Sequence, residues 1–129
     1  MLFRSPATTE LDATGGAMMR AVASVAIGAL MSREAAMRRS AESLARARTG
    51  LDELPVTNHR AGNRHDWEAA NTHAIARVLV EAAVARDESR GCHWRIDDPE
   101  TDPAWECRTI VSLADGVLVL TQAGLEETP

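Results

Sequence analysis

The spacing of apolar and polar residues predicts three helices, at residues 17–31, 32–49 and 64–89. The first segment is almost continuously apolar. The second starts at Ser32, which suits a helix cap, and ends before Gly50, where a glycine can adopt the left-handed conformation that terminates a helix. Its expected buried face consists of Met37, Ala41, Leu44 and Ala45.

The third segment carries the clearest helical pattern. Asn63 is a capping residue, and Asp66 follows where a carboxylate favours the positive end of the helix dipole. Arg77 and Glu81, four positions apart, mark the face expected in solvent. The face expected to be buried repeats every 3.6 residues and comprises Trp67, Asn71, Ala74, Ile75, Val78, Leu79 and Ala82, widened at the side by Val80 and Val84.

The pattern changes near the end of the chain. Residues 107–121 are rich in β-branched side chains, and Asp115-Gly116 in their middle favours a tight hairpin turn. We therefore expect strands at 107–113 and 117–121. The predicted fold class is mainly α: a three-helix bundle, spectrin-repeat-like with up-down-up order, followed by a C-terminal β-hairpin.

Composition divides the chain into one folded domain and two short ends. Residues 1–16 contain Pro6 and Gly15-Gly16 and are expected to form a flexible leader. Residues 124–129 form a polar tail, which leaves 17–123 as the domain. A chain of 129 residues and 13.9 kDa has room for a single modest core.

Charge and cysteine content limit the function classes. A net charge of −5 argues against nucleic-acid binding, which needs a basic surface. Two cysteines, Cys92 and Cys107, do not make a secreted disulfide framework, so we expect a reducing, cytoplasmic environment. The apolar run at 17–31 is shorter than the roughly 20 residues of a membrane span, carries Arg20 and follows acidic residues. It therefore predicts a buried helix rather than a membrane segment or an export signal.

A dense cluster of ionisable residues follows the third helix. Within residues 87–98 it comprises Asp87, Glu88, Arg90, His93, Arg95, Asp97 and Asp98. Gly91 is expected to stop the helix, and Pro99 keeps the segment after it out of helical conformation. Such a cluster is too costly to bury unpaired, so it forms either a solvated loop or a docking surface with matched partners.

Residue chemistry alone indicates no metal site. Cys92, His93 and Cys107 could be joined by a fourth ligand from His59, His65 or His73, but the ligand spacing typical of zinc sites is missing. Ordinary buried thiols and a surface histidine are the simpler interpretation.

Catalytic and cofactor motifs are equally weak. His93 with Asp97, or Ser89 with His93, could be read as a catalytic dyad, yet a salt-bridge and capping network at the helix end explains the same residues. Neither a P-loop nor a strand followed by Gly-x-Gly-x-x-Gly occurs. The basic set at Arg33, Arg38, Arg39, Arg46 and Arg48 is interpreted as a solvated helix face.

One long motif carries more information. Glu68-Ala-Ala-Asn71 is followed by an apolar helix up to Arg86 and then by Glu88-Ser-Arg-Gly-Cys-His-Trp-Arg-Ile-Asp-Asp-Pro99. This arrangement resembles the signature of the C-terminal helical domain of L-aspartate oxidases, E-x-x-N, an apolar helix and R-x-E-S-R-G-x-H-x-R-x-D-x-P. The same domain closes the flavoprotein subunits of succinate dehydrogenase and fumarate reductase. Residues 29–44 also resemble the passage between the first two helices of that domain, so the resemblance covers residues 29–123.

The resemblance implies the C-terminal domain of an FAD-dependent L-aspartate oxidase, which oxidises L-aspartate to iminoaspartate in de novo NAD biosynthesis. The short segment after Pro99 favours this enzyme over the alternative, a succinate dehydrogenase or fumarate reductase flavoprotein. A stand-alone helical interaction module without catalysis is a further alternative. The flavin and capping domains have no counterpart in the chain, so no catalytic or cofactor-binding residue is assigned. FAD is expected in the parent enzyme and not on this chain.

The implied partner is the flavin-binding domain of the parent enzyme, and no nucleic-acid or membrane partner is expected. Six residues are candidates for docking on that domain: Asn71, Glu88, Arg90, His93, Arg95 and Asp97. The chain by itself is expected to be inactive, and its uncovered docking face favours a homo-oligomer.

Overall fold

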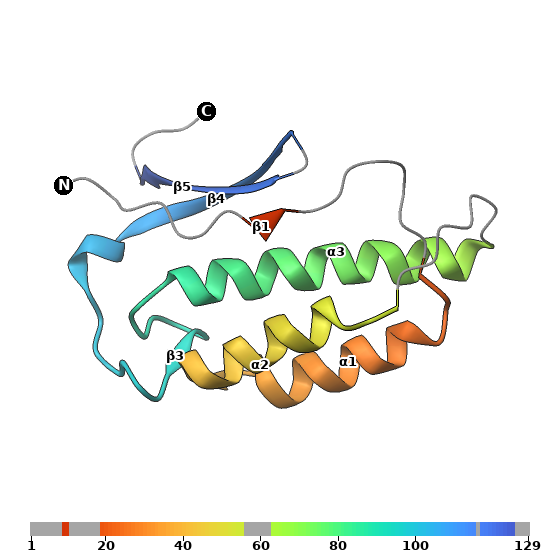
Figure 1. Ribbon diagram of the computed structural model, residues 1–129. Helices are drawn as coiled ribbons and strands as arrows, with labels where there is room; N and C mark the ends of the chain where they lie inside the picture. Colours follow the sequence, from red (N-terminus) through yellow and green to blue (C-terminus); the bar gives the residue numbers. More distant parts are fainter. Residues whose placement is uncertain (1–8, 11–18, 56–62, 116, 126–129) are drawn as a thin grey trace.

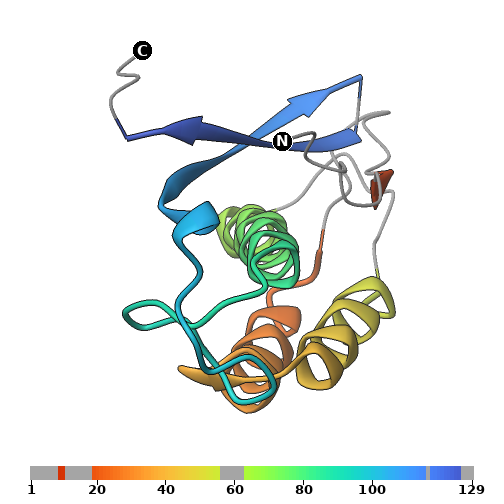
Figure 2. The same ribbon diagram turned by 90° about the vertical axis from the view of Figure 1, so that its left-hand side faces the viewer.

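The computed structural model describes residues 9–10, 19–55, 63–115 and 117–125. Three helices pack together: α1 (Ala23–Glu34), α2 (Ala41–Asp52) and α3 (Arg64–Ala85), each in contact with the other two. Both ribbon views place α3 in a middle layer, with α1 and α2 on one side and a small sheet on the other (Figures 1 and 2). The expected mainly α fold with a C-terminal hairpin is confirmed.

The hairpin consists of β4 (Cys107–Ala114) and β5 (Val117–Gly124), paired in antiparallel register. Asp115 has φ of 52° in the turn between them, as the sequence pattern predicts. A short strand β1 (Thr9–Glu10) pairs with the other edge of β5, which gives the sheet order β1-β5-β4. The predicted leader therefore contains a strand, and the rest of it up to residue 16 lies outside the described residues, as does the tail from 126 onward.

A second, smaller pairing connects segments far apart in the sequence. Strand β2 (Arg38–Arg39), in the link between α1 and α2, pairs in parallel with β3 (Trp94–Arg95), in the loop after α3. A single 3-10 turn, η1 (Pro103–Trp105), then leads into β4. The ladder holds the loop after α3 against the start of α2.

The boundary between the first two helices differs from the prediction. Ser32 lies inside α1, which continues to Glu34, and the predicted helix start at residue 17 lies outside the described residues. The second helix begins only at Ala41. Ser40 is its cap: its side chain accepts a hydrogen bond from the Ser43 amide, and the Ser43 side chain accepts one from the Ser40 amide. Pairing of β2 with β3 keeps the residues before this cap out of the helix.

Gly50 does not terminate α2, contrary to the prediction, because the helix runs on to Asp52. A Cβ atom at Gly50 would lie 2.8 Å from Cδ2 of Leu30, so glycine here permits close approach of α1. The buried face of α2 also differs from the expected one. Leu44 is buried as predicted, but it is accompanied by Ala47 and Leu51, while Met37, Ala41 and Ala45 are exposed.

Helix α3 begins as predicted and ends earlier. The Asn63 side chain accepts hydrogen bonds from the His65 and Asp66 amides, and Asp66 accepts one from the Asn63 amide. The helix ends at Ala85 instead of residue 89, because the segment that follows folds back on itself. Gly91 has φ of +57°, as expected for a left-handed glycine, but it lies in a separate turn and not at the helix end.

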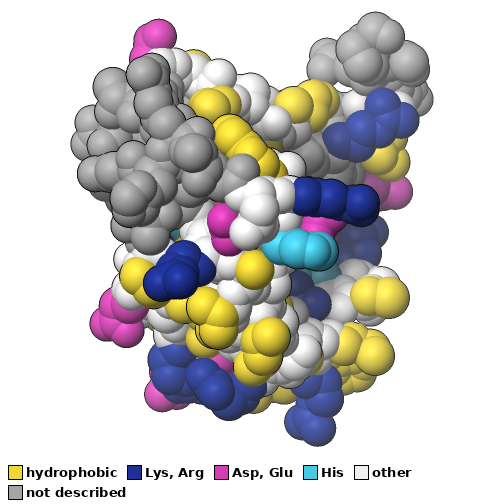
Figure 3. All heavy atoms as spheres, turned by 90° about the vertical axis from the view of Figure 1, so that its right-hand side faces the viewer, with side chains coloured by type: hydrophobic (Ala, Val, Ile, Leu, Met, Phe, Trp, Pro, Cys, Tyr) yellow, Lys and Arg dark blue, Asp and Glu magenta, His cyan; other side chains and the backbone are white. Residues whose placement is uncertain are grey.

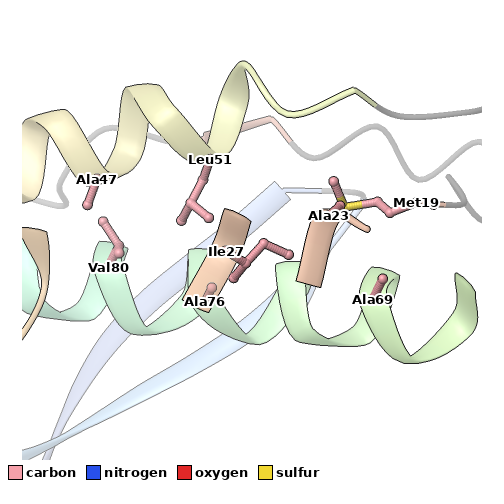
Figure 4. Packing of buried hydrophobic residues seen from close by; sticks show 8 residues of the cluster. All are labelled: Met19, Ala23, Ile27, Ala47, Leu51, Ala69, Ala76 and Val80. Carbon is pink, nitrogen blue, oxygen red and sulfur yellow. The ribbon is translucent and has the colours of Figure 1, made fainter. Parts of the chain in front are cut away.

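The core lies on the face of α3 opposite the predicted one. Its buried members come from all three helices and their N-terminal approach: Met19, Ala23, Ile27, Ala47, Leu51, Ala69, Ala76 and Val80 (Figure 4). The large side chains of the predicted buried face are exposed instead, with Trp67 at 49%, Ile75 at 61% and Leu79 at 55% of full exposure. Val78 and Ala82 are half-buried, and Val80, predicted to widen this face, is buried in the core. Helix α3 is apolar on both faces, and its small alanines allow the closest approach of neighbouring helices, so the alanine face is the one covered within this domain.

The pair predicted to mark the solvent face is not exposed, since Glu81 is buried and Arg77 is half-buried. Glu81 receives two hydrogen bonds from Arg48 of α2, at 2.7 and 2.5 Å, and Arg77 pairs with Asp52 at 3.2 Å. The basic set interpreted as a solvated face is likewise partly engaged, since Arg33 and Arg46 both bind the buried carboxylate of Glu34. Apart from Arg33 with Glu34, which both belong to α1, these ion pairs connect the helices to one another.

Candidate functional site

The segment after α3 folds back on itself around Ser89, which is buried. Its hydroxyl oxygen accepts a hydrogen bond from the Arg95 amide at 2.7 Å and donates to the Asp98 carbonyl at 2.8 Å. Its backbone amide donates to the Glu100 carbonyl, and its own carbonyl accepts from the Thr101 hydroxyl. The side chain and backbone groups of Ser89 thus bind backbone or hydroxyl groups at four later positions of the loop.

Glu88 is the fully buried anion of this loop. Its carboxylate accepts hydrogen bonds from the guanidinium groups of Arg86 and Arg90, the latter at 2.8 Å, and from the Asp102 amide at 2.9 Å. Burial raises the pKa of Glu88, but the hydrogen bonds from Arg90 and Asp102 outweigh it and leave the pKa below its usual value. Glu88 is therefore a paired carboxylate and not a proton donor at neutral pH.

Arg86 connects α3 to the hairpin. Its guanidinium donates to the carbonyls of Trp105 and Cys107, at 3.2 and 3.1 Å, and lies 5.2 Å from the centre of the Trp105 ring. Arg86 and Trp105 were not among the residues predicted to contribute to the site. A large aromatic side chain in an otherwise polar loop is the sequence signal that could have indicated Trp105, which is buried.

Arg95 is buried and forms a two-point contact with Asp97, at 2.9 and 2.8 Å. It also donates to the Arg86 carbonyl at 3.1 Å. Asp97 in turn accepts a hydrogen bond from the Ala41 amide at 2.8 Å, at the first turn of α2. The Arg95 guanidinium, with help from this amide and against partial burial, holds the pKa of Asp97 well below its usual range.

His93 is a half-buried, neutral side chain. Its Nε2 atom lies 3.1 Å from the Arg86 carbonyl, to which it donates. Burial lowers the pKa of His93, and the nearby guanidinium groups of Arg39 and Arg95 lower it further, against the hydrogen bond to the carbonyl. Neither of the dyads considered from the sequence forms, since Asp97 is engaged by Arg95 and the Ser89 hydroxyl by backbone groups.

The structure brings five of the six docking candidates together and separates the sixth. Glu88, Arg90, His93, Arg95 and Asp97 all belong to this loop network. Asn71 lies elsewhere, exposed near the middle of α3, and its side chain makes no hydrogen bond to the described part of the chain. Because the loop charges find partners within the chain, their density does not by itself require an external partner. Their role in docking stays a prediction.

The remaining candidate chemistry is sparse. Cys92 is exposed and Cys107 half-buried, so the expectation of two buried thiols is wrong for Cys92. Among the described residues, no group of three or more His, Cys, Asp or Glu side chains is placed to hold a metal ion. The described helices are also too short or too polar to cross a bilayer.

These observations define the class of protein: a helical domain in which a charged loop connects the third helix to the second helix and to the hairpin. The particular family follows from comparison with known proteins. Residues 25–122 match the family model described as the C-terminal part of the fumarate reductase flavoprotein, and the chain belongs to this family. The resemblance stated from the sequence is thereby confirmed.

Curated relatives are named L-aspartate oxidase. The Streptomyces coelicolor enzyme is 40% identical over 101 residues, which cover 70% of this chain and 17% of the relative. The Mycobacterium leprae enzyme is 42% identical over 86 residues, 67% of this chain and 16% of the relative. The chain thus spans only about one sixth of the length of the curated relatives that it matches.

A solved structure shares the fold. The FrdA chain of a mutant E. coli quinol fumarate reductase superimposes with a TM-score of 0.64 and 23% sequence identity, over 92% of this chain and 23% of that chain. The likeness extends beyond the helices to nearly the whole chain. It shows that the two chains share this fold.

Proposed function

We propose that the chain is the C-terminal domain of an FAD-dependent L-aspartate oxidase, the enzyme that converts L-aspartate to iminoaspartate in de novo NAD biosynthesis. The observation that carries this proposal is the 40% identity to the S. coelicolor L-aspartate oxidase across most of the chain. In this proposal FAD and the catalytic residues belong to the flavin-binding part of the parent enzyme. The chain alone binds no flavin and is inactive.

Two alternatives are kept. A C-terminal domain of a succinate dehydrogenase or fumarate reductase flavoprotein is favoured by the description of the family model and by the structural likeness. A stand-alone helical interaction module is favoured by the loop network, whose hydrogen bonds and ion pairs are formed within this chain. The proposal includes the up-down-up order of the helices, supported by Figure 1, in which α2 runs opposite to α1 and α3.

The docking candidates have two roles in this proposal. Glu88, Arg90, His93, Arg95 and Asp97 fix the shape of the loop that the flavin-binding domain contacts, and Asn71 offers an exposed amide to it. Support comes from the buried or half-buried state of Glu88, Arg90, His93 and Arg95, which makes the loop rigid before any partner binds. A rigid surface loses less conformational entropy on docking than a mobile one does.

A chimera tests the function. Residues 25–122 of this chain would replace the matching C-terminal segment of the S. coelicolor enzyme, with the same enzyme truncated before that segment as the negative control. We expect the purified chimera to show bound-flavin absorbance and to release peroxide when given L-aspartate. The same replacement in the E. coli fumarate reductase flavoprotein tests the alternative, since flavin retention in that host alone would contradict the proposal.

A further inference from the structure

Helix α3 carries an uncovered apolar surface, here called the α3 stripe, formed by Trp67, Asn71, Ala74, Ile75, Val78, Leu79 and Ala82. Its spacing of 3.6 residues is that of a buried helix face. Yet its three largest side chains are about half exposed or more, Trp67 at 49%, Ile75 at 61% and Leu79 at 55%. The side chains of Val78 and Ala82 are only partly covered.

The stripe lies on the far side of α3 from the core. Ala69, Ala76 and Val80 face α1 and α2, and helical geometry places the stripe about half a turn away from them. That is the side on which the sheet lies in Figures 1 and 2, and the sheet contacts α3 through β4, yet the large side chains of the stripe stay exposed. Figure 3, which views the end at which α3 begins, also shows hydrophobic side chains reaching the surface among charged ones.

The composition of the stripe suits burial against protein. It contains no charged residue, and its one polar side chain, the Asn71 amide, makes no hydrogen bond to the described residues. Tryptophan is one of the side chains that most often dominate the binding energy of protein interfaces. An apolar helix face left open in this way marks an interaction site more often than it marks ordinary surface.

We propose that the α3 stripe is the surface on which the preceding, flavin-binding part of the same polypeptide packs in the parent enzyme. This inference rests on the proposed function. The matched family segment is the C-terminal part of its flavoprotein, and the chain covers only 17% of the S. coelicolor relative, so most of that protein is available to cover the stripe. In this arrangement the ion pairs of the charged loop form within the chain and fix the shape of the loop. The stripe provides the apolar contact with the flavin-binding part.

The test uses paired variants in both the 129-residue chain and the chimera. Ile75→Gln with Leu79→Gln keeps helix propensity, since glutamine and leucine are similar helix formers, and removes only apolar contact. Val25→Gln, at a position on α1 that is 76% exposed, is the matched control. In the 129-residue chain we expect neither change to lower the melting temperature, because these side chains contribute little to the core.

In the chimera, the double variant should release FAD at least about tenfold faster than the unmodified chimera, as expected when two interface anchors are lost. Val25→Gln should leave the release rate unchanged. Equal release rates for the double variant and the control would overturn the inference while an active chimera still upholds the proposed function. A chimera that retains no flavin at all would count against the proposed function and against this inference with it.

A second copy of the chain is the competing occupant of the stripe. Sedimentation of the 129-residue chain separates the two cases. If the chain dimerises, the double variant abolishes the dimer, and the chimera releases flavin at the same rate with and without the variant, then the stripe is a self-association surface and the proposal is wrong.

Discussion

At the residue scale, ion pairs and hydrogen bonds neutralise charged side chains that would otherwise be costly to bury. Glu88 is fully buried with three donors, and Arg95 is buried with a carboxylate and a carbonyl. Leaving a charge of this kind without its partner typically costs about 3–5 kcal/mol. The charged side chains of the motif were visible in the sequence, but their partners were not, because Asp102 and Ala41 contribute backbone amides that no side-chain pattern encodes.

Asp97 gives this network a measurable pH dependence. Its pKa in the folded chain lies below the value of about 3.9 expected in the unfolded chain, so its contribution to stability is complete above pH ~5 and is lost progressively as the pH falls further. Asp97→Asn should lower the free energy of unfolding by about 1 kcal/mol at pH 7, a modest value because the carboxylate is partly exposed to solvent. The difference from the unmodified chain should shrink steadily as the pH falls below ~4 and be smallest at the most acid pH measured.

Urea unfolding at a series of pH values measures this effect. Asp98→Asn is the matched control, since the Asp98 side chain makes no hydrogen bond or ion pair to the described residues. The free energy of unfolding of the Asp97 variant could instead differ from that of the unmodified chain by the same amount from acid to neutral pH. That result would show that the carboxylate charge is not the source of the stability.

At the element scale, sequence pattern located helices well and their faces poorly. The cap at Asn63 and the hairpin turn at Asp115 follow from strong local preferences, and both are confirmed. The wrong assignment concerns α3, whose two apolar faces have similar spacing. Periodicity identifies an apolar face but not which neighbour covers it, and here the face with the larger side chains is the exposed one. The early end of α3 was missed because long-range hydrogen bonds to Ser89 decide it.

The cap of α3 allows a clean test of element stability. Asn63→Ala removes the side chain that accepts hydrogen bonds from the His65 and Asp66 amides, so we expect a loss of about 1 kcal/mol in the free energy of unfolding. Asn71→Ala, at an exposed position within the same helix, should be neutral or slightly stabilising because alanine is the better helix former. Thermal unfolding followed by circular dichroism measures both, and equal losses would argue against the cap.

At the scale of the whole molecule, the chain combines a self-contained charged loop with an open apolar face. The alanine-rich core holds α3 against α1 and α2 through small contacts, and ion pairs such as Arg48 with Glu81 add connections between the helices. A domain of this size with a thin core gains stability when a further surface covers its remaining apolar side chains. This is the arrangement expected of the C-terminal domain of a flavoprotein.

Carbene footprinting of the α3 stripe tests the central claim most directly. Trp67, Ile75 and Leu79 should be labelled readily in the 129-residue chain and strongly protected in the flavin-bound chimera, while Val25 on α1 should be labelled equally in both. Undiminished labelling of the three stripe residues in a chimera that holds FAD would show that the flavin-binding part packs elsewhere, and would contradict the account.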